Sequence, residues 1–122
     1  MLDRIATNLE HYMNLLSARQ KLVASNIANA DTPGYKTKDI DFQFEFMSLA
    51  PKASVNGAPL AGSNPNVIEA QGLAIKNDGN NVDMDRESRM LAENAMRFSL
   101  ASTIAKGQIR AIRNAIQEGR GG

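Results

Sequence analysis

Few side chains in this sequence have the type and spacing that catalysis or metal binding requires. The 122 residues include one histidine, His11, and no cysteine, which excludes disulfides, thiolate ligands, cysteine nucleophiles and any site built from several histidines of one chain. Asp83, Asp85 and Glu87 are closely spaced, but they lack the glycine and the distal glutamate of a calcium loop. We interpret them as acids in the first turn of a helix. We expect no catalytic residue, no metal site and no cofactor.

The charge balance disfavours a nucleic-acid-binding protein. The chain has 14 basic and 13 acidic residues and a formal net charge of +1, whereas proteins that neutralise phosphates usually carry a clear basic excess. Basic residues do gather near the end of the sequence, which we interpret as a solvated helix face and favourable charge near a helix C-terminus. These residues are Arg97, Lys106, Arg110, Arg113 and Arg120.

The sequence also predicts no direct insertion into a membrane. No segment approaches the roughly 20 apolar residues that a membrane-spanning helix needs. The first residues read Met-Leu-Asp-Arg-Ile, without the basic start and apolar run of a cleavable secretory signal. We therefore expect a protein that stays in the cytoplasm or leaves the cell by a route that uses no cleaved signal peptide.

The first strong pattern covers residues 1–31 and predicts one long helix. Its apolar residues follow a heptad seam that is interrupted at Arg19 and Asn26, and a second row flanks it, as is typical of a helix packed by more than one neighbour. The helix must end near residues 29–31, because Pro33 disfavours helical geometry at Thr32 and Pro33-Gly34 suits the centre of a type II turn. The seam comprises Leu2, Ile5, Leu9, Tyr12, Leu16, Val23 and Ala30, flanked by Met13, Gln20 and Ile27.

Residues 32–82 form a middle region with little helical character. Between Asp39 and Phe46 apolar and polar residues alternate, which favours a half-buried strand, although Phe42, Phe46 and Leu49 also suit a short helix. The phenylalanines at 42, 44 and 46 could dock a partner, but local packing is the interpretation we favour. Pro and Gly recur after residue 50, so this part is expected to be extended, locally paired or ordered by a partner.

A second heptad seam covers residues 83–118 and predicts the final helix. Asp83 supplies a cap, and Gly107 weakens the helix by about 1 kcal/mol relative to Ala, which suggests close approach of another backbone. The residues 119–122 are Gly-rich and are expected to fray. The seam comprises Met84, Leu91, Asn94, Phe98, Ala101, Ala105, Gln108, Ile112 and Ala115, widened by Ile104, Ile109 and Ile116.

The sequence therefore predicts a mainly α fold in which long amphipathic helices at both ends enclose an irregular or short-β middle region. Aromatic residues are only 5% of the chain, and small and aliphatic side chains suit helix seams better than a β-sandwich core. One antiparallel helix hairpin buries a single stripe on each helix and leaves the flanking rows exposed. We therefore expect the helices to complete an antiparallel coiled coil or helical bundle with neighbouring subunits.

Three polar residues of the first helix, two of them on its seam, leave their roles open. Asn26 and Asn29 either form hydrogen bonds specific to assembly or are simply favoured near a helix end. Arg19 either pairs with an acid across an interface or lays its stem over apolar surface with its head in solvent. We favour the second interpretation for Arg19.

Two motifs resemble those of flagellar rod and hook proteins. The segment 24–36 reads Ala-Ser-Asn-Ile-Ala-Asn-Ala-Asp-Thr-Pro-Gly-Tyr-Lys and lies at the end of the first long helix, where that family carries its N-terminal signature. The segment 78–87 resembles the start of the C-terminal helix in the proximal rod branch of the family. Together the resemblance covers about two thirds of the chain and leaves residues 48–74 unmatched. Its first motif rests on Ser25, Asn26, Ile27, Asn29, Asp31, Thr32, Pro33, Gly34 and Tyr35.

The resemblance implies a structural subunit rather than an enzyme. Such a subunit would be exported unfolded through the flagellar type III apparatus and would join the periplasmic rod of the basal body, between the membrane ring and the distal rod and hook. Its partners would be further copies of itself, other flagellar rod proteins, and adaptor proteins of the membrane ring and export gate. Its assembly interface would comprise Leu9, Leu16, Val23, Ile27, Leu91, Phe98, Ile109 and Ile112.

Two other functions stay open at this point. One is a different axial protein of the same family, and the other is a small helical adaptor or chaperone for secretion. An adaptor would be stably folded and soluble alone, so circular dichroism of a dilute sample distinguishes it from a subunit that needs neighbours. An enzyme would need convergent polar groups in a pocket, which the residue types do not supply.

Overall fold

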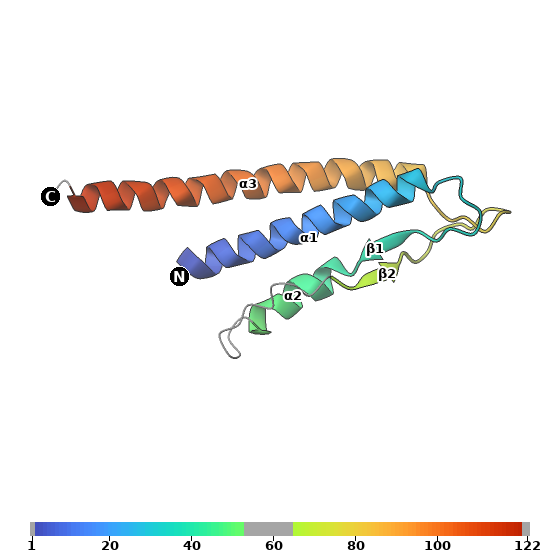
Figure 1. Ribbon diagram of the computed structural model, residues 1–122, viewed down its shortest axis with the longest axis horizontal. Helices are drawn as coiled ribbons and strands as arrows, with labels where there is room; N and C mark the ends of the chain where they lie inside the picture. Colours follow the sequence, from blue (N-terminus) through green and yellow to red (C-terminus); the bar gives the residue numbers. More distant parts are fainter. Residues whose placement is uncertain (1, 53–64, 121–122) are drawn as a thin grey trace.

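The computed structural model describes residues 2–52 and 65–120 and shows a mainly helical chain (Figure 1). The long helix α1 (Leu2–Ala28) is followed by the strand β1 (Lys38–Ile40) and the short helix α2 (Phe42–Lys52). The strand β2 (Val67–Glu69) then pairs with β1, and the helix α3 (Met84–Arg120) ends the chain. The predicted fold class is confirmed: long helices lie at both ends and a short two-stranded sheet lies between them.

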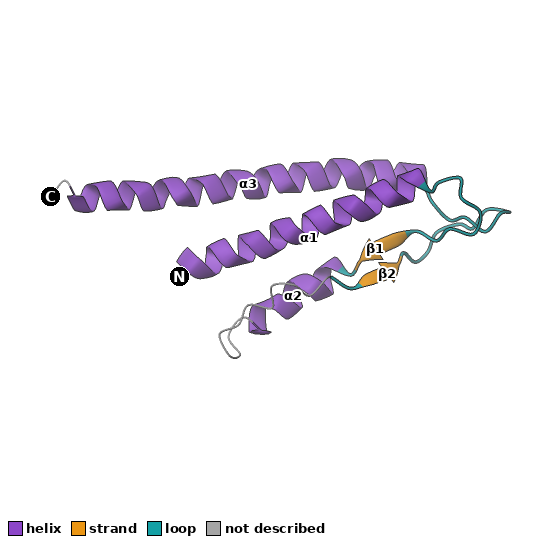
Figure 2. Cartoon of the chain, viewed as in Figure 1, coloured by secondary structure: helices purple, strands orange, loops and turns teal. Residues whose placement is uncertain are grey.

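The elements form three side-by-side layers. Helices α1 and α3 pack as an antiparallel hairpin, and the segment β1–α2 runs back along the other side of α1, as Figure 2 shows. Strands β1 and β2 are antiparallel, with Lys38 opposite Glu69 and Ile40 opposite Val67. We refer to residues 37–52 and 65–70 as the arm. Helix α1 is therefore covered on two sides, whereas α3 contacts the rest of the described chain on one side.

The small core lies where the first heptad seam meets α3 and β1. Leu16, Val23 and Ala101 are each 2% exposed, and Ile40 and Val82 are also buried. The buried positions of α3 are Glu87, Asn94 and Ala101, which are seven residues apart and so lie on one face of the helix. The heptad pattern thus identifies the face of each long helix that packs inside the chain.

The predicted turn after α1 has the expected geometry. Gly34 has a φ of +76°, and the amide of Tyr35 donates a hydrogen bond of 3.2 Å to the carbonyl of Thr32. This is a type II turn with Pro33 and Gly34 at its central positions. It redirects the chain from α1 into the arm.

The alternating segment from Asp39 to Phe46 is neither one strand nor one helix. The strand ends at Ile40, and α2 begins at Phe42 because Asp41 caps the helix: its side chain accepts a hydrogen bond of 3.2 Å from the amide of Phe44. A strand through Phe46 is therefore wrong, and each of the two interpretations describes half of the segment. Residues 53–64, where part of the irregular middle region was predicted, lie outside the described residues.

Helix α3 starts at the predicted cap and continues past its predicted end. The carboxylate of Asp83 accepts hydrogen bonds from the amides of Asp85, at 3.0 Å, and Arg86, at 3.4 Å. The helix includes Gly119 and Arg120, which were assigned to a frayed tail. All residues from 111 to 120 are exposed, and Figure 1 shows α3 extending beyond the N-terminus of α1.

Candidate assembly interface

The motif after the first helix forms a buried junction, and Asn26 lies at its centre. Its side chain is 0% exposed. The amide nitrogen donates to the carbonyl of Lys38, at 2.8 Å, and to the carboxylate of Glu87, at 3.1 Å. The amide oxygen accepts from the Tyr35 hydroxyl, at 2.9 Å, and from the Lys38 amide, at 3.0 Å. One side chain therefore connects α1, β1 and α3.

Four charged side chains extend this junction. The guanidinium of Arg19 donates to both carboxylate oxygens of Asp39, at 2.9 and 3.0 Å. Arg86 donates to Asp39 at 2.8 Å and to Glu87 at 2.6 Å. Two guanidinium groups thus balance two carboxylates in a site where Glu87 is fully buried. Removal of one partner from a buried pair leaves an uncompensated charge and is strongly destabilising, so these contacts hold β1 against both long helices.

The loop before α3 closes the end of α1. The side chain of Asn80 donates to the carbonyls of Asn29, at 2.9 Å, and Thr32, at 2.8 Å. Asn81 accepts from the amide of Thr37 at 2.6 Å, and the Thr37 hydroxyl donates to the carbonyl of Asn81 at 3.2 Å. The carbonyls that a helix end leaves free are therefore satisfied by a segment about 50 residues away in the sequence.

The remaining motif residues lie around the same turn. Asn29 donates back to the carbonyl of Ser25 at 2.8 Å and accepts from the Thr32 hydroxyl at 3.0 Å. Ile27 is half-buried, whereas Asp31 and Pro33 are exposed. The motif therefore builds the junction inside one chain, and most of its polar side chains are satisfied there.

These contacts resolve the interpretations left open for Arg19, Asn26 and Asn29. Arg19 pairs with Asp39 of its own chain, and its guanidinium lies 5.5 Å from the centre of the Phe42 ring, so the interpretation that its head is in solvent is wrong. Asn26 does more than terminate a helix, since it joins three elements. Asn29 acts at the helix end, as its second interpretation states.

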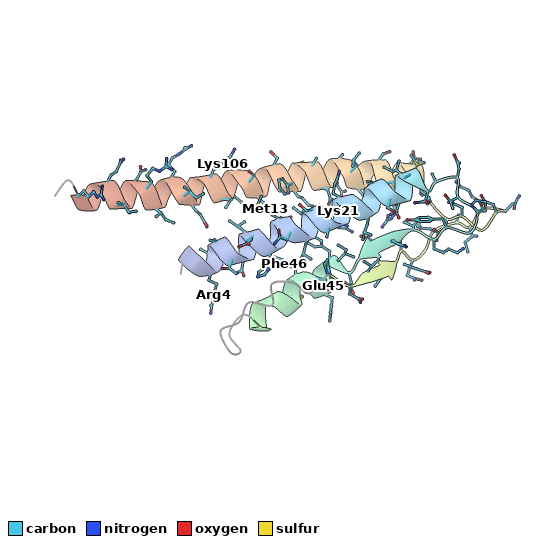
Figure 3. All side chains as sticks on the ribbon, in the orientation of Figure 1. Arg4, Met13, Lys21, Glu45, Phe46 and Lys106 are labelled. Atoms are coloured by element: carbon cyan, nitrogen blue, oxygen red, sulfur yellow. The ribbon has the colours of Figure 1, made fainter. Side chains whose placement is uncertain are left out.

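The arm packs on α1 through aromatic rings. Tyr12 meets Phe42 and Phe46 edge-on, with centroid distances of 5.7 and 5.9 Å, which is a favoured geometry for aromatic pairs. Figure 3 shows Phe46 between α2 and α1. Phe44 is 60% exposed. Of the three alternating phenylalanines, two therefore serve local packing, and only Phe44 points away from these contacts.

The predicted interface residues divide into an inner and an outer group. Leu16 and Val23 lie in the core between elements of the same chain, and Leu9 and Ile27 are half-buried. The four predicted residues of α3 are all exposed, by 37% to 57%: Leu91, Phe98, Ile109 and Ile112. Together with Ile116 they form an apolar strip that we call the open stripe.

A groove lies between α1 and α3, and three residues of the open stripe form part of its wall. Leu9 and Met13 line it on α1, and Phe98, Ile109 and Ile112 line it on α3. Its volume is about 350 Å³. Figure 3 shows Met13 between the two helices. We call this the end groove.

A further apolar row on α3 was not predicted as an interface. Met96, Leu100 and Ile104 are 67%, 62% and 45% exposed and are four residues apart, so they form one ridge along the helix. We call them the outer row. Asn94 and Ala101 define the face against α1. Met96 lies on the side turned away from that face, and the outer row winds through Leu100 to Ile104 on its flank. The spacing of four residues is the signal for this row in the sequence, and it crosses the heptad seam of the same helix.

The close approach of a backbone predicted at Gly107 has no counterpart within the described chain. A Cβ added at Gly107 would meet no atom within 4 Å, so no backbone of the described chain approaches this glycine. No group of three or more potential metal ligands occurs in residues 2–52 and 65–120. Within the same residues, no helix combines the length and the apolar character needed to cross a membrane.

The sequence matches known flagellar proteins over almost its whole length. Residues 13–36, which include the junction motif, match the family model described as Flagella basal body rod protein. The Flagellar basal body rod protein FlgB of Salmonella typhimurium is 34% identical over 98% of this chain and 99% of its own length. The proteins of the same name from Yersinia ruckeri and Borrelia hermsii are 32% and 30% identical, over 98% and 88% of this chain and 100% and 93% of their own lengths. The chain therefore belongs to the flagellar basal-body rod proteins, in the FlgB family.

Proposed function

We propose that this structural subunit of the flagellar basal-body rod transmits torque from the membrane ring to the distal rod and hook. It would do so by packing its two long helices against further copies of itself and against other rod proteins. The family is a structural one and not a family of enzymes. Torque passes between subunits through closely packed side chains, so a stiff helical interface suits this role.

The observation that carries the proposal is the change in burial along one face of α3. Asn94, near the junction, is 4% exposed. Ile112 follows 18 residues later, which is five helical turns and therefore the same face, yet it is 41% exposed. A face that is buried at one end and apolar but exposed at the other needs a second surface to cover it.

The junction would hold the parts of the subunit in a fixed orientation within the rod. Arg19, Asp39, Arg86 and Glu87 join both long helices to the arm, so the arm cannot swing independently of the helices without breaking these ion pairs. In a rod that turns as one body, this fixed orientation would pass a force on the arm to the helices.

The location and the partners follow from the family resemblance. We propose that the chain reaches the periplasmic part of the basal body through the flagellar type III export apparatus, without a cleaved signal peptide. It would contact adaptor proteins of the membrane ring and export gate as well as other rod subunits. The absence of cysteine from the sequence suits an oxidising compartment, since no unwanted disulfide can form.

The test places a charge on the open stripe. We expect Ile112→Asp to abolish rod assembly and swimming while the chain is still secreted, because a carboxylate cannot be buried in an apolar interface without a large desolvation penalty. Rods are counted in isolated basal bodies, and secreted chain is measured by immunoblot of the medium.

Gln117→Asp is the matched control, since it adds the same carboxylate to an exposed position of the same helix outside the open stripe. Normal rods and normal swimming with Ile112→Asp would refute the proposal. Leu16→Asp is less informative, because Leu16 is buried inside the chain and its substitution disturbs folding as well as assembly.

A further inference from the structure

We infer that the end groove of one subunit receives the outer row of a second copy of this chain. This inference rests on the proposed function and specifies which two surfaces meet. The end groove lies between α1 and α3, and the outer row of Met96, Leu100 and Ile104 winds from the side of α3 turned away from α1 to the flank of that helix. Each subunit therefore carries both halves of the contact.

The end groove has the size and chemistry to hold a few apolar side chains. A cavity of about 150 Å³ lined by apolar residues holds one benzene molecule, so the groove volume of about 350 Å³ has room for about two side chains of that size. Leu9, Met13, Phe98 and Ile109 are the large apolar residues in its walls, together with Ile112. A whole helix does not fit into this space, but the ridge of one does.

The outer row is such a ridge. Its three side chains are exposed by 45% to 67%, and at a rise of 1.5 Å per residue they span about 12 Å along the helix. Ridges of side chains four residues apart pack into the grooves of neighbouring helices in most helical proteins. None of the described residues of the same chain covers the outer row.

One charged side chain at each surface is of opposite sign. Glu10 lies at the wall of the end groove, and Arg97 lies three residues from Leu100, which makes them neighbours on one helix. Both side chains are exposed, and neither belongs to any of the ion pairs within the described chain. Docking the outer row into the groove would place an arginine near an unpaired glutamate.

The two surfaces also have the geometry of a growing assembly. The end groove and the outer row are different patches, so a contact between them is heterologous and leaves one free groove and one free row at the ends of any oligomer. Heterologous contacts that do not close into a ring produce helical filaments. A symmetric pair would instead bring identical patches together and stop growth.

The test uses disulfide crosslinking in assembled rods, which is simplified because the natural chain has no cysteine. The variant Met13→Cys/Leu100→Cys is produced in cells, and its swimming is measured in the presence of a reducing agent, which shows whether rods form. After mild oxidation, we expect a ladder of covalent dimers and higher multimers of the chain. A disulfide needs Cα atoms within about 7 Å, so the ladder reports direct contact of groove and row.

Met13→Cys/Lys106→Cys is the matched control. Lys106 is exposed on α3, on the side away from α1 (Figure 3), but outside the outer row, so we expect no ladder. If either double variant fails to swim, Ile109→Cys/Ile104→Cys examines the same contact. Swimming cells without a ladder, an equal ladder from the control, or a crosslink only to another protein would each overturn the inference and leave the rod function itself intact.

A charge exchange gives a second readout. In the double-cysteine background we expect Glu10→Arg or Arg97→Glu alone to lower the ladder yield about fivefold, because each places like charges together. The two exchanges combined should restore it to within about twofold. Equal ladder yields in the double-cysteine background, the two single exchanges and the combined exchange would show that Glu10 and Arg97 do not meet. That result would overturn the predicted register of the two surfaces.

Discussion

At the scale of single residues, the fold depends on polar side chains at seam positions where an apolar residue is usual. Asn26 is fully buried and forms four hydrogen bonds to three other residues, each in a different part of the chain. Asn29 forms only local hydrogen bonds near the end of α1. Two asparagines three residues apart therefore have different structural roles, although the sequence makes them look equivalent.

Substitution of these two asparagines should separate the roles. We expect Asn26→Ala to lower the free energy of unfolding by about 3 kcal/mol, because it leaves buried partners without hydrogen bonds. Asn29→Ala should lower it by about 1 kcal/mol, as for loss of an ordinary hydrogen bond. Urea denaturation followed by circular dichroism measures both values, and equal losses would contradict the distinction.

The sequence identifies the seam but not the partners of its polar residues. The heptad pattern places Leu16 and Val23 on the seam, and both are buried inside the chain, since apolar periodicity depends only on local geometry. It cannot reveal that Arg19 meets Asp39, or that Glu87 meets Asn26 across 61 residues, because ion pairs between distant segments leave no periodic signal. Glu87 also lies on the α3 seam, three residues after Met84, and that position was the one available hint.

At the scale of elements, the two loops at the junction fit together through a close contact of glycines. Gly34 and Gly79 have φ values of +76° and +87°, which glycine adopts without strain. A Cβ added to Gly79 would lie 3.3 Å from the Cα of Gly34, whereas a Cβ on Gly34 would meet no atom within 4 Å. The second loop therefore depends on a glycine for both its backbone angle and its space.

Alanine substitution at Gly34, Gly79 and Gly107 should change the stability of the chain by different amounts. Gly34→Ala should destabilise the chain by about 1 kcal/mol from the positive φ alone, and Gly79→Ala by about 2–3 kcal/mol because the close contact adds to the strain. Gly107→Ala should stabilise it by about 0.5–1 kcal/mol, since alanine is the better helix former and the site is open. Urea denaturation of the three variants checks the order, and a Gly34 variant less stable than the Gly79 variant would contradict it.

The short elements of the arm show where local patterns are insufficient. Alternating residues from Asp39 to Phe46 fit a strand and also fit a helix that places Phe42 and Phe46 on one side. Tertiary contacts decide between them: Asp39 is fixed by Arg19 in the strand, and Phe42 and Phe46 meet Tyr12 from the helix. Neither partner lies within the segment itself, so no reading of the segment alone could settle its structure.

At the scale of the whole molecule, apolar side chains are buried unevenly between the two long helices. Helix α1 is enclosed by α3 and the arm, whereas α3 leaves the open stripe and the outer row exposed. Apolar surface contributes to stability roughly in proportion to the area removed from water. The isolated chain therefore lacks stabilisation that a neighbouring copy would supply.

Stability should consequently depend on the concentration of the chain. We expect a hundredfold increase in concentration to raise Tm by about 5 °C, because association stabilises the folded state by mass action. Ile112→Asp should remove this dependence, while Gln117→Asp should retain it. Thermal melts followed by circular dichroism provide the measurement, and a Tm independent of concentration in the natural chain would contradict the argument.

The ten residues at the end of α3 have a consequence for how a rod grows. Residues 111–120 are helical yet exposed throughout, although Ile112 lines the end groove. Helical turns with little tertiary packing are only marginally stable in water. In a polymer, the last-added subunit would have these marginally stable helical turns at its exposed end. The next subunit to bind would pack against them and stabilise them. Rigidity would then arise one step behind the growing end, which leaves the tip compliant enough to admit the next subunit.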